Sequence, residues 1–72
     1  MERRKMVQIV TEYITLGQLL KITSWADSGG AAKAIINQLN ITVNGEKDNR
    51  RGRKLYAGDE IKINGKTYTI DR

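Results

Sequence analysis

The sequence contains no cysteine, histidine, proline or phenylalanine. Without cysteine the chain forms no disulfide and offers no thiolate ligand. Without histidine it lacks the commonest general base and transition-metal ligand near neutral pH. The eight Asp and Glu residues are scattered, and no spacing pairs two of them on one helical face. We therefore predict that the protein is not an enzyme, and that it has no catalytic residues, no cofactor, no metal site and no small-molecule substrate.

Long apolar runs are also missing. No uninterrupted apolar stretch approaches the roughly 20 residues that a membrane span needs, and the basic start, Met1 to Lys5, is followed by a polar mixture instead of a hydrophobic signal core. Thirteen Lys and Arg residues against eight Asp and Glu residues give a net charge of +5 over 72 residues, which favours attraction to polyanions. Nucleic acid and anionic membrane surfaces are the two usual targets of such a charge, and of these we expect nucleic acid and no membrane as the partner of a cytoplasmic protein.

Two short helices are predicted from capping residues and apolar spacing. Thr15 followed by Gln18 matches a capping box and predicts a helix from Leu16 to Ile22 or Thr23. Asp27 or Ser28 can cap a second helix, in which apolar residues recur at i, i+3, i+4 and i+7: Ala32, Ile35, Ile36 and Leu39.

Strands are predicted before and after these helices. The segment Met6 to Glu12 suits a short strand, and Ile41 to Val43 is a β-forming run that ends at the hairpin turn Asn44-Gly45. A second such turn, Asn64-Gly65, precedes the alternating segment Lys66 to Ile70. The expected fold class is α+β, with two short helices packed on a small, mostly antiparallel sheet. We divide the chain into a basic leader with a short N-terminal strand (1–12) and a single domain (13–72).

The strongest functional feature is a basic run between two expected strands, Asn49 to Lys54, here called the arginine loop. It carries Arg50, Arg51, Arg53 and Lys54, interrupted only by Gly52. Guanidinium groups bind phosphate through a planar pair of donors, so three arginines favour phosphate contacts. The alternative interpretation is a loop that only keeps the protein soluble.

The start of the second helix is another candidate anion site. In the segment Ser28 to Lys33, backbone N–H groups and small residues permit a close approach, although an ordinary helix cap has the same composition. Among the aromatic residues, we assign Tyr56 and Tyr68 mainly to packing and leave base stacking by Trp25 open.

These elements and residues together resemble the S4 RNA-binding domain family, over roughly Tyr13 to Ile63. The resemblance is carried by Leu16 to Lys21, by the helix opening at Ser28, by the strand and turn Ile41 to Gly45, and by the turn Gly58 to Ile61. With the arginine loop, so short a chain is similar to small standalone bacterial S4-domain proteins.

The resemblance implies an S4-like fold with the αL motif and an RNA surface formed by the second helix and the loop after Asn44-Gly45. By motif it implicates the helix opening Ser28, Gly29 and Gly30, the basic residue Lys33, and Asn44; Asn37 is added from helical spacing alone. Near the positions of Thr15, Gly17 and Gln18, many family members place arginine, aspartate and lysine, which this sequence lacks there. We therefore expect the arginine loop to make a larger share of the RNA contacts here than the first helix does.

The predicted function is non-catalytic binding of structured, ribosomal RNA, or of a ribosomal particle, through phosphate and shape recognition. The main alternative is a ribosome-associated adaptor that binds protein and uses its basic loop only for solubility. A sulfur-carrier protein and a membrane-surface binder are weaker alternatives, because the first needs a Gly-Gly end and the second a cationic face on the first helix.

Overall fold

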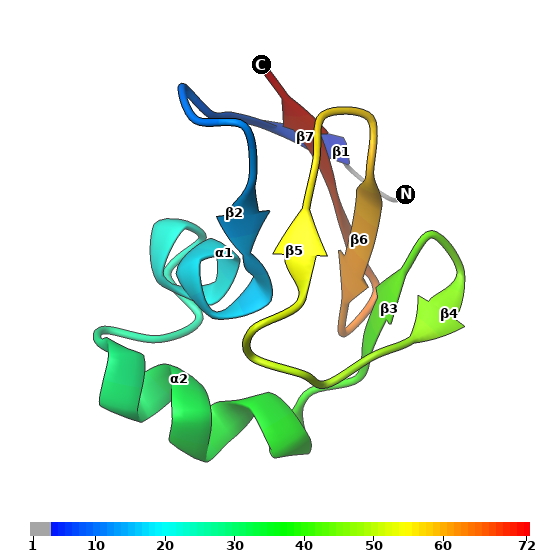
Figure 1. The fold of residues 1–72 in the computed structure, drawn as a ribbon. Coiled ribbons are helices and arrows are strands. Elements are labelled where there is room, and N and C mark those ends of the chain that lie inside the picture. The colour runs from blue at the N-terminus through cyan, green and yellow to red at the C-terminus, as the bar shows by residue number, and fades with distance from the viewer. Residues whose placement is uncertain (1–3) are drawn as a thin grey trace.

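The computed structural model describes residues 4–72, so the expected basic leader falls partly outside the described residues. Two α-helices, one 3-10 helix (η1) and seven strands make up the described chain (Figure 1). In chain order the elements are β1 (Arg4–Gln8), β2 (Ile14–Thr15), α1 (Leu16–Ile22), α2 (Gly29–Ile35), η1 (Ile36–Gln38), β3 (Ile41–Val43), β4 (Glu46–Lys47), β5 (Lys54–Leu55), β6 (Glu60–Ile63) and β7 (Lys66–Asp71).

The strands form one larger sheet and one small ribbon. The five-stranded sheet has the order β1-β7-β6-β3-β4, and β2 pairs antiparallel with β5 outside it. The β1–β7 pair is parallel, whereas the other pairs of the larger sheet are antiparallel. The α+β class and the mostly antiparallel sheet are thus confirmed, and Figure 1 shows the β2–β5 ribbon beside α1, with α2 below it.

The first strand differs from its predicted bounds for a reason that lies in its partner. β1 covers Arg4–Gln8 instead of Met6 to Glu12 because it pairs residue by residue with β7, which ends at Asp71 opposite Gln8. The backbone N–H of Ile9 still donates to the carbonyl of Asp71 at 2.7 Å. Beyond that point β7 offers the chain no further partner.

Capping residues determine where both α-helices begin. The Thr15 hydroxyl accepts from the backbone N–H of Gln18, and the Gln18 side chain accepts from the backbone N–H of Thr15, so the predicted capping box is present. Ser28 caps α2 by accepting from the N–H of Ala31. The predicted Asn-Gly turns are also confirmed: φ is positive at Asn44 and Gly45 (52° and 87°) and at Asn64 and Gly65 (49° and 87°).

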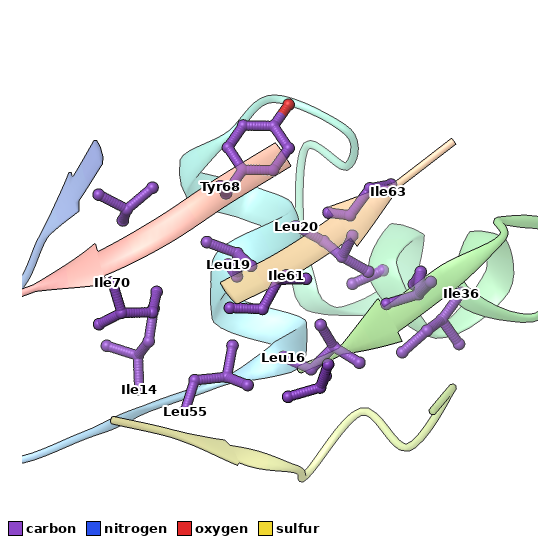
Figure 2. Packing of buried hydrophobic residues seen from close by; sticks show 14 of the residues in the cluster. Ile14, Leu16, Leu19, Leu20, Ile36, Leu55, Ile61, Ile63, Tyr68 and Ile70 are labelled. Carbon is purple, nitrogen blue, oxygen red and sulfur yellow. The ribbon is translucent and has the colours of Figure 1, made fainter. Parts of the chain in front are cut away.

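The core lies between the helices and the inner face of the five-stranded sheet. Leu16, Leu19 and Leu20 of α1 are fully buried, and they lie among Ile61 and Ile63 of β6 in Figure 2. Ile14 and Leu55 of the ribbon join the same cluster. The arginine loop follows β4 and ends at the first residue of β5. It lies outside this core.

Tyr68 is buried, as predicted, and its hydroxyl accepts from the indole N–H of Trp25 at 3.0 Å. Tyr56 differs from the prediction, because 43% of it is exposed. It follows the buried Leu55 in an extended segment, so its side chain projects to the opposite, outer face.

Candidate nucleic-acid interface

The arginine loop is anchored to α1 through its backbone and to the region of η1 through Asn49. The N–H groups of Leu16 and Gly17, in the first turn of α1, donate to the carbonyls of Arg53 and Arg51 at 2.8 and 2.9 Å. These donors have no partner within the helix itself. The side-chain amide of Asn49 donates to the carbonyls of Ile36 (2.7 Å) and Leu39 (3.2 Å) at the other helix end. The loop is therefore held in place between α1 and η1.

Asp48 binds two of the three arginines of the loop. Its carboxylate accepts from Nε and Nη2 of Arg50 at 3.1 and 2.8 Å, and from Nη1 of Arg53 at 2.9 Å. The side-chain hydrogen bonds from Arg50 hold the pKa of Asp48 well below its usual range and outweigh the effect of partial burial, which raises it. One negative charge thus offsets part of the charge of Arg50 and Arg53. The acid two positions before Arg50 is the sequence signal that predicts such a pairing.

Arg51 is arranged differently. No ion pair or side-chain hydrogen bond involves it within residues 4–72, and it lies across the start of α1. A Cβ placed on Gly17 would stand 2.6 Å from Cγ of Arg51 and 3.3 Å from its carbonyl oxygen. Only a glycine leaves room for the Arg51 side chain at this position. Gly17, one of the three positions at which the sequence was expected to depart from the S4 pattern, is therefore the residue on which Arg51 packs.

A hollow of about 330 Å³ opens where α1, α2 and the arginine loop meet. Its walls include two cations, Lys21 of α1 and Arg51, together with small residues from all three segments. The lining consists of Thr15, Gly17, Gln18, Lys21, Gly29, Ala32, Arg51 and Gly52. The opening of α2 and the arginine loop, which sequence reasoning left as separate candidates, thus border one hollow.

The residues predicted on α2 lie in different positions around this hollow. Gly29 lines it, and the side chain of Ser28 is engaged in capping the helix. Gly30 and Lys33 are exposed but are not part of the lining. The predicted second helix ends as α2 at Ile35, so Asn37 lies in η1, where it is also exposed and outside the lining.

Asn44 lies in the β3–β4 turn, and its amide has structural partners. Nδ2 donates to Asp59 at 3.1 Å, and Oδ1 accepts from the backbone N–H of Glu60 at 2.9 Å. These bonds join the β3–β4 turn to the turn before β6. Figure 1 shows this hairpin at one edge of the larger sheet, away from α1.

Sequence reasoning did not select Lys21, Gly17 or Asp48 as parts of the site. The helical period of α1 puts Gly17 and Lys21 four residues apart and therefore on one face, which is the signal that was available for Lys21. The close approach of Arg51 to Gly17 had no local signal, because it joins segments more than thirty residues apart.

Comparison with known proteins agrees with this architecture. The family model for the S4 domain matches residues 7–71. The chain belongs to the S4 domain family. The match extends beyond the expected Tyr13 to Ile63 at both ends, and it includes the last two residues of β1 and all of β7.

Two curated relatives align with this S4-domain protein over similar shares of both chains. It is 52% identical over 59 residues to the Bacillus subtilis (strain 168) protein named "Probable ribosome maturation protein RlbA", covering 82% of this chain and 83% of that one. It is 29% identical over 58 residues to the Escherichia coli (strain K12) protein named "Putative RNA-binding protein YbcJ", covering 81% and 83%. No solved structure matches the chain.

Proposed function

We propose that this S4-domain protein is a non-catalytic RNA-binding protein that contacts the phosphates of structured RNA at the hollow between α1, α2 and the arginine loop. The observation that carries the proposal is the position of Arg51. It lies on Gly17, beside Lys21, with no carboxylate partner in the described chain. A guanidinium without an internal partner keeps its full charge and its paired donors for a phosphate.

The surroundings of Arg51 support binding by shape and charge. Its backbone carbonyl accepts from the N–H of Gly17, so ordering the loop costs little further entropy when RNA binds. Gly29 and Gly52 line the same hollow and present no side chain there, which permits the close approach of a sugar-phosphate backbone. Arg50 keeps further N–H donors in solvent, since its side chain is 73% exposed despite its pairing with Asp48.

The relatives support RNA as the partner and make a ribosomal target the first choice. One relative's name contains ribosome maturation and the other's contains RNA binding. The proposed partner is therefore ribosomal RNA, free or within a ribosomal particle, and the proposed location is the cytoplasm. No helix in the part of the chain that the structure describes has the length and apolar character to cross a bilayer.

The test is a salt titration of binding to a structured RNA, a matched DNA duplex and anionic vesicles, with wild type and Arg51→Ala. Wild type is expected to prefer the RNA, and the variant to bind it about tenfold more weakly at low salt. The slope of log K against log salt should flatten by about 0.7 to 0.9, the contribution of one phosphate contact.

Lys66→Ala is the matched control, because it removes the same charge from an exposed position beside Trp25. It should leave the slope unchanged. Equal, weak binding to all three polyanions, or equal effects of the two variants, would reject the proposal. If Arg51→Ala still associates normally with ribosomal particles, the result would instead favour the alternative function, an adaptor that binds protein.

A further inference from the structure

The β2–β5 ribbon has an outer face whose residues do not contribute to the core. Ile14 pairs with Leu55, and Thr15 pairs with Lys54. Side chains alternate between the faces of a strand, so the buried Ile14 and Leu55 define the inner face. Tyr13, Thr15, Lys54 and Tyr56 consequently project outward, and we call these four residues the ribbon face.

Two aromatic rings and a cation lie together on the ribbon face. The ring centroids of Tyr13 and Tyr56 are 5.7 Å apart and tilted by 48°, and Nζ of Lys54 lies 5.0 Å from the Tyr13 centroid. Tyr13 is 37% exposed and Tyr56 is 43% exposed. Burial does not require aromatic residues here, because the core is closed by Ile14 and Leu55 on the other face.

The ribbon face is continuous with the cationic hollow at Arg51. A second hollow, of about 470 Å³, is lined by Thr11, Glu12, Tyr13, Thr15 and Gln18. Thr15 and Gln18 line this hollow and also the one that holds Arg51. Thr15 and Gln18 thus lie between the two hollows, and a ligand that passes over them at the start of α1 can contact both Arg51 and Tyr13.

We infer that the ribbon face binds an unpaired nucleotide that adjoins the structured RNA held at Arg51. The base stacks on one ring of the tyrosine pair, since the two rings are tilted by 48° to each other, and Lys54 contacts the neighbouring phosphate. Base stacking on aromatic side chains is tolerant of sequence, and it is commonly combined with a cationic track along the backbone. The inference rests on the proposed RNA-binding function and adds to it a preference for RNA in which a helix meets a single strand.

The test compares two RNA hairpins of the same stem, one blunt and one with an unpaired tail of about four nucleotides. Fluorescence anisotropy gives the affinity of wild type, Tyr13→Leu/Tyr56→Leu and Tyr13→Phe/Tyr56→Phe for each. The leucine variant should lose about tenfold in affinity for the tailed hairpin only, whereas the phenylalanine variant, which keeps both rings, should retain it. A tail containing 2-aminopurine should be quenched on binding to wild type and not to the leucine variant.

Lys54→Gln and Lys66→Gln form a matched pair, because each lysine lies over an aromatic ring and only Lys54 belongs to the ribbon face. Only Lys54→Gln should weaken binding of the tailed hairpin. If wild type binds both hairpins equally and the tyrosine variants change neither, the stacking inference fails while the proposed function stands. Equal losses on both hairpins would also overturn the inference, and failure of wild type to bind either hairpin would reject the proposed function with it.

Discussion

Gly17 determines where the side chain of Arg51 can lie. An alanine at this helical position gains about 1 kcal/mol of intrinsic helix propensity, but its Cβ would collide with Cγ of Arg51. We expect Gly17→Ala to fold and to bind structured RNA about as weakly as Arg51→Ala, because the guanidinium is displaced from the hollow. RNA affinities of both single variants and the double variant, measured by anisotropy, check this: the double variant should bind no more weakly than Arg51→Ala.

Gly30→Ala is the control for this residue. Gly30 is exposed in α2, does not line the hollow, and a Cβ there meets only the Ser28 hydroxyl at 3.9 Å. Its RNA affinity should remain that of wild type. Additive losses in the Gly17→Ala/Arg51→Ala double variant would show that Gly17 acts independently of Arg51 and would contradict the positioning role.

Among the elements, the arginine loop depends on Asp48 for its conformation. We expect Asp48→Asn to lower the free energy of unfolding by about 1 to 2 kcal/mol at neutral pH, because charge-assisted hydrogen bonds from Arg50 and Arg53 are lost. The folded-state pKa of Asp48 lies below the unfolded value, so this stabilisation is present above about pH 4 and is lost as the pH falls toward the folded-state pKa. Urea unfolding followed by Trp25 fluorescence at several pH values measures the difference in the free energy of unfolding between wild type and variant. This difference should become smaller in acid.

Asp71→Asn is the control, because it makes the same change of charge on an exposed residue of β7. Its free energy of unfolding at neutral pH should stay close to that of wild type. A difference for Asp48→Asn that stays constant down to about pH 2 would mean that the carboxylate is not the stabilising group.

Elements whose signals are local were predictable from the sequence. The capping box needs only Thr15 and Gln18, and the hairpin turns need only an asparagine followed by a glycine. The arginine loop was recognisable by its composition, yet the unequal roles of its arginines were not, since Arg51 differs from Arg50 only through contacts with Asp48 and Gly17. The tyrosine pair was missed because Tyr13 and Tyr56 come together only when β2 pairs with β5.

For the whole molecule, the unpredicted feature is the parallel pairing of β1 with β7, which places the first and last strands of the described chain side by side. Val7 pairs with Ile70 and is 6% exposed in the core, whereas Val10 just beyond the strand is 94% exposed. A chain of this size has a small core and a correspondingly small stability. Within the segment 1–12, expected to be a leader with a short strand, residues 4–8 thus form a strand of the main sheet, and the boundary drawn at residue 13 remains a prediction.

The two valines provide a test of how far β1 stabilises the whole fold. Val7→Ala removes two buried methyl groups and should cost about 2 kcal/mol, which for so small a domain corresponds to a fall in Tm of roughly 8 to 16 °C. Val10→Ala removes the same groups from solvent and should change stability by no more than about 0.5 kcal/mol. Thermal unfolding followed by circular dichroism measures both, and equal Tm values for the two variants would show that β1 packs on a domain that is stable without it. A large loss for Val7→Ala alone would mean that β1 and β7 unfold together with the helices that hold the arginine loop, since Val7, Ile70 and Leu16 share one core.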